Sequence, residues 1–331
     1  MKKILWLLQR MLITLGLTAL LFQLGKFLPY SGDGAYVEQM ANMDWVVLMH
    51  SIFTTLMHKT VCTMLQPWGW STWNSVSVSS ALGGALAVQF LFAMRRDPLF
   101  LLINLLSGSF LVFVGEVENY SWVNAFLLGS FYYTERYLEG KSPLFPALLM
   151  FFIACLFHML ALFYLLPLMG VMKKYPRFAP WEFLVPFLLF ALGTIACNLL
   201  FNHEGPDLDL DRLVPLFAIH RQGQHFTFFS WAHWKILAYF HVHAAFLGLP
   251  IEIPLLIWLR KGIRTPFHVF LFQCTVIGLA WTTVWYPDLG RLDWDLFSQM
   301  GIALHLLLGI LLSDRAQKEH WTFAIFYRNN T

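Results

Sequence analysis

Long apolar runs follow one another along the chain, separated by short polar or charged segments. Each run is long enough to cross the roughly 30 Å hydrocarbon layer of a bilayer as an α-helix. The runs that predict such spans are residues 4–28, 71–94, 98–115, 121–138, 181–201, 236–258, 266–285 and 299–313. We therefore expect an all-α protein, a polytopic bundle of about eight to ten membrane helices, that forms a single domain over residues 1–331.

One further apolar run, residues 143–172, is flanked by positive residues at both ends, Lys141 and Lys173. It is too short for two full crossings, yet the flanking charges favour a cytoplasmic position for both ends. We expect two short half-helices that form a hairpin near His158, with its turn covered by other helices, because lipid cannot satisfy free backbone groups. A single tilted span is the alternative, and it would invert the orientation of everything that follows.

Residues 45–65 have a different pattern, in which polar side chains recur at helical spacing and apolar ones form the opposite face. The polar positions are Ser51, Thr54, Thr55, His58 and Cys62. This pattern predicts an amphipathic helix lying in the outer membrane interface. It falls in a first outer loop of about residues 29–70, and a second outer loop covers about residues 202–235.

Composition and charge support this topology. The chain is 58% hydrophobic and only 12% charged, whereas soluble domains average about 25% charged residues. Most of the 22 Lys and Arg residues fall on the side that holds both termini, including the tail 314–331. By the positive-inside rule both termini are then cytoplasmic, and we expect a multi-pass protein of a bacterial inner (plasma) membrane.

Acidic residues gather at the opposite, outer face. Asp33 lies in Ser31-Gly32-Asp33-Gly34, just past the first span. The flanking glycines allow a sharp turn and the close approach of a ligand, so the carboxylate could face a cavity at the membrane surface. An ordinary turn is the alternative interpretation.

Glu116 and Glu118 follow an apolar run directly, and Asn119 and Tyr120 lead straight into the next run. Polar groups this close to hydrocarbon need partners or water. A solvated hairpin tip is one interpretation. Proton transfer, a hydrogen bond to a substrate hydroxyl, or binding of an optional divalent cation are the functional ones.

The segment before the last span carries a third candidate group, Arg291, Asp293, Trp294 and Asp295. Asp295 could simply cap the following helix, because a carboxylate there satisfies free amides and the helix dipole. Asp293 and Trp294 are candidates for sugar contact, since an aromatic face beside a carboxylate suits a hydroxylated ring.

Few cations are expected outside, and three residues of the second outer loop are candidates for binding a phosphate. They are Arg221, His233 and Lys235. Arg binds phosphate through a planar fork and Lys binds it as a point charge. The aromatic residues around them could equally form an interfacial belt.

The twelve histidines show no His-Glu-x-x-His or similar ligand cluster, so we expect no metal site built from them. His158, at the predicted hairpin, could instead bond freed backbone carbonyls. No phosphate loop or nucleophile elbow is present, and no nucleic-acid partner is expected.

At these residues the chain resembles the bacterial members of the GT-C superfamily, integral-membrane glycosyltransferases that use polyprenyl-phosphate-linked sugars. The resemblance is carried by Gly32-Asp33-Gly34, the amphipathic helix after it, the segment from Gly115 to Tyr120, the hairpin with His158, and Asp293-Trp294-Asp295. It implies a GT-C-like bundle in which an acid of the first outer loop is the catalytic acid/base, the role that Asp33 would take here.

The function expected from this resemblance is inverting transfer of a hexose or pentose at the outer face. The donor is a polyprenyl-phosphate-linked sugar in membrane lipid, and the acceptor is a hydroxyl of a glycan, lipid or protein. The alternative is a transporter or flippase for a lipid or small solute that uses Glu116 and Glu118. Glu252, between two prolines within a span, favours the transporter unless its carboxyl is simply paired inside the bundle.

Overall fold

The computed structural model describes residues 2–27, 34, 37–38, 52–117, 120–201, 213–219, 224–244, 249–287 and 297–319. Within these ranges all regular elements are helices, joined by turns and irregular segments, and one isolated bridge links Leu213 and Trp285. The prediction of an all-α protein is confirmed.

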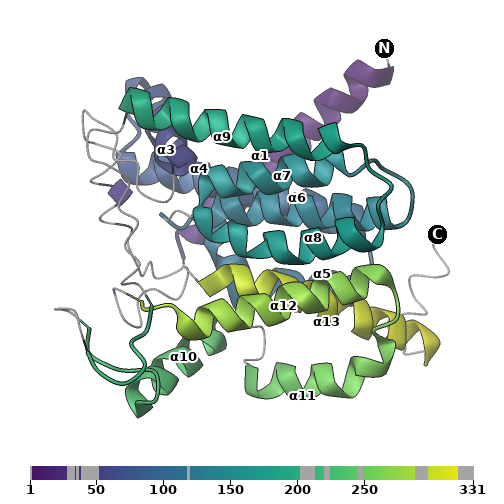
Figure 1. The fold of residues 1–331 in the computed structure, drawn as a ribbon. Coiled ribbons are helices and arrows are strands. Elements are labelled where there is room, and N and C mark those ends of the chain that lie inside the picture. The colour runs from purple at the N-terminus through teal and green to yellow at the C-terminus, as the bar shows by residue number, and fades with distance from the viewer. Residues whose placement is uncertain are drawn as a thin grey trace. The chain divides into compact units, whose positions relative to one another are not determined.

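The helices run along the chain in an order that follows the apolar runs (Figure 1). They are α1 (Lys2–Gly25), α3 (Ile52–Leu65), η1 (Gln66–Trp68), α4 (Thr72–Met94), α5 (Pro98–Leu105), η2 (Gly108–Phe113), α6 (Tyr120–Leu138), α7 (Phe145–Phe157), η3 (Met159–Tyr164), α8 (Leu165–Lys174), α9 (Pro180–Phe201), α10 (Trp231–Ala244), α11 (Leu249–Leu259), η5 (Arg260–Gly262), α12 (Pro266–Val284) and α13 (Ser298–Lys318).

Four of the described helices are long and apolar enough to cross a membrane. The crossing segments are Leu8–Gly25, Thr72–Met94, Pro180–Cys197 and Pro266–Val284, in α1, α4, α9 and α12. Only 17% of the α1 and α9 segments is buried. Apolar surface left uncovered by protein is suited to lipid, so these helices agree with the predicted membrane protein. The side that each terminus faces stays a prediction.

Two of the predicted spans are not continuous helices. The run 98–115 forms α5 and then η2, and the run 236–258 forms α10 and α11. At the first break, the Ser107 hydroxyl donates to the Asn104 carbonyl oxygen at 2.9 Å, a bond that competes with helical bonding. The second break falls at residues 245–248, outside the described ranges.

The run 143–172 is interrupted at the expected residue. α7 ends at Phe157, and His158 has an extended backbone with φ −159° and ψ 126°. The Leu160 amide donates to His158 Nδ1 at 3.2 Å. The imidazole therefore accepts from a backbone amide and so satisfies one free donor of the new turn. The expected bond from His158 to a backbone carbonyl stays a prediction. Whether α8 returns as a hairpin stays a prediction.

The chain forms two compact units. Unit 1 comprises Met1–Phe90, Leu111–Leu162 and Phe178–Pro206, and unit 2 comprises Leu91–Phe110, Phe163–Arg177 and Asp207–Thr331. The sequence predicted one domain over residues 1–331, and the two units together cover the same residues. Each unit has its own buried helices, and each is described separately below.

In unit 1, α7 packs between α6 and α9, and α3 packs on α7. The α7–α9 contact is aromatic, with the Phe152 ring against Phe183, Phe187 and Phe190. The start of the two helices is joined by Glu182, whose carboxylate accepts from the Phe145 amide at 2.9 Å and the Ala179 amide at 3.0 Å. One buried acid thus satisfies amide donors from two helix N-termini.

A glycine sets the distance between α4 and the end of η2. A Cβ on Gly84 would lie 2.5 Å from the Phe113 carbonyl oxygen and 2.8 Å from Leu21 Cδ1. Gly84→Ala is therefore expected to lower the free energy of unfolding by about 1–3 kcal/mol through overpacking. The control is Gly16→Ala, where a Cβ meets nothing within 4 Å. Thermal unfolding of both variants in lipid nanodiscs checks this, and equal melting temperatures would contradict it.

In unit 2, α13 is the central helix, because nearly every residue from Ser298 to Leu311 is buried. It packs against α5, α12, α10 and α11. The Tyr164 hydroxyl donates to the Gln299 carbonyl oxygen at 3.0 Å near its start. Along one face, Gly301 and Gly309 bring α5 and the following turn close: a Cβ on Gly309 would lie 2.9 Å from Asn104 Nδ2.

Candidate functional site

The turn that carries Glu116 is fixed against α4 in unit 1. Gly115 has a φ of +74°, a conformation that side chains with a Cβ rarely adopt. The Ser77 hydroxyl donates to the Gly115 carbonyl oxygen. At the start of α6, the Ser121 hydroxyl donates to the Ser80 carbonyl oxygen at 2.6 Å. The serines of α4 therefore determine where the backbone on both sides of Glu116 lies.

Glu116 is buried, with 7% of its surface exposed. Within the described residues, its Oε2 atom has no hydrogen-bond partner. Burial raises the pKa of the Glu116 carboxyl from 4.5 to about 8, because the low-dielectric surroundings disfavour the charged form. At neutral pH the side chain is then a neutral acid that can donate a hydrogen bond.

The segment between α1 and α3 meets this turn at Gly34. A Cβ on Gly34 would lie 3.2 Å from the Val117 carbonyl oxygen and 2.9 Å from the Trp73 ring. Val37 continues the contact, in a buried cluster with Val117, Val76 and Cys62. The residue after Asp33 and the residue after Glu116 are therefore neighbours, although they lie far apart in sequence. Asp33 itself lies outside the described residues.

Tyr120 and His158 form a second contact in the same unit. Their ring centroids are 5.3 Å apart at 44°, and both side chains are buried. Tyr120 is the first residue of α6, and His158 is the residue that interrupts the α7–η3 segment. The fold thus brings together two of the residues predicted to bind substrate, one at the end of the Glu116 turn and one at the helix break.

The amphipathic helix α3 turns its polar face inward. Thr54, Thr55, His58 and Cys62 are all buried, whereas Met64 is 67% exposed. The Thr54 hydroxyl donates to the Phe157 carbonyl oxygen at 2.8 Å, where α7 ends. Thr54 on this polar face therefore satisfies a backbone carbonyl at the helix break near His158. The helical spacing in the sequence identified this polar face, but not its burial.

Removing this hydroxyl tests its contribution to the break. Thr54→Val is expected to lower the free energy of unfolding by about 1–3 kcal/mol, because a buried carbonyl loses its donor. Thr60→Val is the matched control, since the Thr60 hydroxyl is exposed and bonds only within α3, to the Leu56 carbonyl oxygen. Chemical unfolding in detergent micelles measures both, and a loss in Thr60→Val as large as in Thr54→Val would refute the assignment.

His233 and Lys235 lie in unit 2 on different faces of α10. His233 is buried among the rings of Phe226, Phe228 and Trp234, whereas Lys235 is exposed. Burial lowers the pKa of His233, against a smaller opposing effect from a hydrogen bond with the Thr283 backbone. Burial therefore favours the neutral form of His233, and the phosphate role of this residue and of Lys235 stays a prediction.

The remaining candidates fall outside the described residues. They are Glu118, Asn119, Arg221, Arg291, Asp293, Trp294 and Asp295. Within the described ranges, no three His, Cys, Asp or Glu side chains are grouped so that they could hold a metal ion.

A buried pair in unit 2 shows whether the Glu252 carboxyl has a partner inside the bundle. His305 Nε2 lies 3.3 Å from Glu252 Oε1, and each side chain is 1% exposed. Glu252 is thus a carboxyl paired inside the bundle, which was one of its two interpretations. His305 stood alone in the sequence, and nothing in the local pattern indicated its partner.

No protein-family model, curated protein or solved structure matches this chain.

Proposed function

We propose that the protein is an inverting glycosyltransferase that takes a hexose or pentose from a polyprenyl-phosphate carrier at the outer face of the membrane. The observation that carries the proposal is the contact of Gly34 with the Val117 carbonyl oxygen. It brings the loop that bears Asp33 against the turn that bears a buried, neutral Glu116.

The two acids suit different roles. Asp33 would remove the proton from the acceptor hydroxyl as its oxygen attacks the anomeric carbon, and the lipid phosphate would leave with the bonding pair of electrons. Glu116, being neutral, would donate a hydrogen bond to a sugar or acceptor oxygen. Tyr120 and His158 would border the same space, since an aromatic ring suits a sugar face.

A transporter or flippase is the second candidate function. The buried Glu116 supports it as well, because a carboxyl with a pKa of about 8 can take up and release a proton near neutral pH. The two candidates differ in the fate of the donor, since a transferase breaks the glycosyl–phosphate bond and a flippase moves the lipid intact.

Reconstitution of the full chain in liposomes separates the two. The liposomes contain polyprenyl-phosphate hexose or pentose labelled in the sugar, with a crude envelope extract of lipids and glycans as acceptor. Transfer predicts that label leaves the polyprenyl fraction and enters the acceptor fraction in proportion to the protein added. Label that stays on the polyprenyl lipid but becomes accessible to a membrane-impermeant reagent would overturn the transferase and support the flippase.

A further inference from the structure

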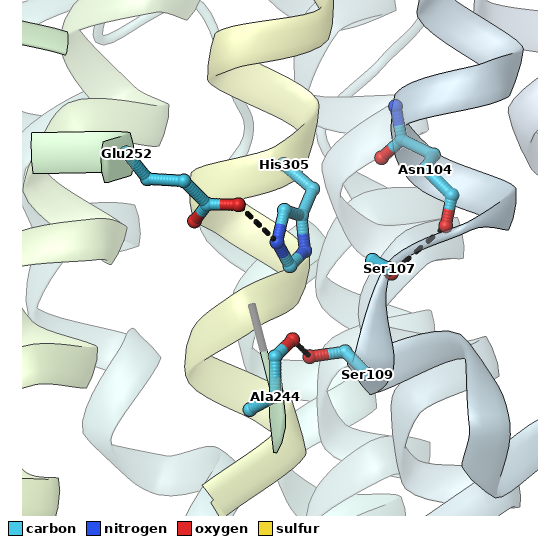
Figure 2. Close-up of polar contacts among 6 residues, drawn as sticks. All are labelled: Asn104, Ser107, Ser109, Ala244, Glu252 and His305. Atoms are coloured by element: carbon cyan, nitrogen blue, oxygen red, sulfur yellow. Dashed lines mark hydrogen bonds and ion pairs between the residues drawn. The ribbon is translucent and has the colours of Figure 1, made fainter. Parts of the chain in front are cut away.

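The interior of unit 2 contains a carboxyl and an imidazole from different helices. Glu252 projects from α11 and His305 from α13, and the two side chains point toward each other (Figure 2). Both are 1% exposed, with His305 Nε2 3.3 Å from Glu252 Oε1. Buried ionisable groups are costly in an apolar bundle and therefore mark functional positions.

A second imidazole belongs to the same group. His241, near the end of α10, interacts electrostatically with Glu252 and is 4% exposed. Among the described residues, its Nδ1 atom has no hydrogen-bond partner. One acid and two bases from three helices are thus buried in the interior of unit 2, with Glu252 in contact with His305 and close enough to His241 to influence its charge.

The other polar groups at this point bond within the fold. The Ser109 hydroxyl donates to the Ala244 carbonyl oxygen at 2.7 Å (Figure 2). Asn104 Nδ2 donates to the Phe100 carbonyl oxygen at 2.8 Å. The absence of a side chain on Gly301 lets Ser109 approach α13 beside His305. These groups do not titrate near neutral pH, so they set the shape of the site and not its charge.

The other titratable and charged groups on the elements around α11 and α13 lie on neighbouring helices or toward helix ends. Among the described residues they are Tyr164 in η3, His268 and Cys274 in α12, His233, Lys235 and Tyr239 in α10, Asp97 before α5, Arg260 and Lys261 in η5 with Arg264 after it, and Asp314, Arg315, Lys318 and Glu319 at the end of α13. His268 bonds the Gly262 carbonyl oxygen at 3.1 Å, and Arg315 lies over the Trp258 ring.

We propose that Glu252, His305 and His241 form a proton-binding site in the interior of unit 2. The ligand is a single proton taken from water and returned to it. Glu252 and His305 are electrically neutral as a pair whether their shared proton is on the oxygen or on the nitrogen. One added proton then leaves both the Glu252 carboxyl and the His305 ring protonated, and the net charge of the site rises by one.

Because the partner of Glu252 is a histidine, we assign proton exchange to this pair and not a fixed ion pair. An Arg or Lys in place of His305 would keep its proton across the physiological range, whereas imidazole changes charge near neutrality. The site lies in unit 2 and shares no residue with the Glu116 turn in unit 1. The inference therefore goes beyond the proposed function and does not depend on it.

Infrared difference spectroscopy of the full chain in nanodiscs tests the site, with pH cycled between about 5 and about 9. All samples carry Glu116→Gln, so that the Glu116 carboxyl does not contribute. We expect a C=O stretch of a buried protonated carboxyl that changes with pH and shifts in heavy water. Glu252→Gln should remove this band, and Glu319→Gln should leave it unchanged, because Glu319 is an exposed partner of Arg315.

The histidines give a second readout that keeps Glu252 in place. His305→Gln and His241→Gln should each move the pH midpoint of the Glu252 band by about one unit or more, a tenfold change in proton affinity. If Glu252→Gln does not fold, the pH midpoints of the histidine variants test the proposal. A parent protein without a titrating carboxyl band, a band that survives Glu252→Gln, or midpoints that neither histidine variant moves would overturn the proposal.

Discussion

Asp33→Asn is expected to lower the rate of sugar transfer by about 10²- to 10⁴-fold, the range that a positioned general base contributes. Asparagine has nearly the same shape but cannot accept the acceptor proton. The KM for the donor should change little, because the lost interaction acts on the hydroxyl that attacks. The measurement is initial-rate transfer of labelled sugar from the polyprenyl carrier in liposomes.

The matched control is Glu139→Gln, which also replaces a carboxylate by an amide. Glu139 follows α6 and pairs with Lys141 at 2.9 Å, with 38% of its side chain exposed. This variant should transfer sugar at the parent rate and show the same melting temperature. If Asp33→Asn retains more than about a tenth of the parent rate, Asp33 is not the base.

Glu116→Gln is expected to remove a pH dependence of stability that the parent protein has. The pKa of the Glu116 carboxyl is about 8 in the folded chain, against an ordinary value of 4.5. Below about pH 4.5 both the folded and the unfolded chain hold this proton. As the pH rises toward about 8, the unfolded chain releases the proton while the folded chain keeps it, so the free energy of unfolding falls.

The size of this fall is about 1.4 kcal/mol for each unit of difference between the two pKa values. Glutamine is neutral at every pH, so the variant should be more stable than the parent above about pH 8, by several kcal/mol. Melting temperature in nanodiscs, measured across this range for the parent, Glu116→Gln and Glu139→Gln, checks the expectation. A pH profile that is the same in all three would show that the Glu116 carboxyl is solvated.

The spans that could be predicted from the sequence are those whose cause is local. Hydropathy over about 20 residues determines whether a helix can cross a membrane, and this property is confirmed for α1, α4, α9 and α12. The interruption at His158 was also predicted, from the length of the run and the charges at its ends. The break after α5 was not, because the Ser107 hydroxyl that bonds the Asn104 carbonyl oxygen does not alter the apolar pattern.

The candidate site could be predicted only in part. Acidic residues at loop ends identified Glu116 and the segment next to Gly34, and the fold brings these two segments into contact. The helical spacing of Thr54, His58 and Cys62 defined one face of α3. Spacing separates the two faces of a helix but does not say which face is covered, and the covered one proved to be polar.

The sequence by itself determined that this chain is helical, apolar enough for a membrane and interrupted by polar segments, because these properties depend on neighbouring residues and on the period of the helix. Only the tertiary structure decided that Glu116 is buried, that Gly34 lies against Val117, and that His305 faces Glu252. Those residues are far apart in the chain, so their distances depend on how whole helices pack, and no local pattern contains that information.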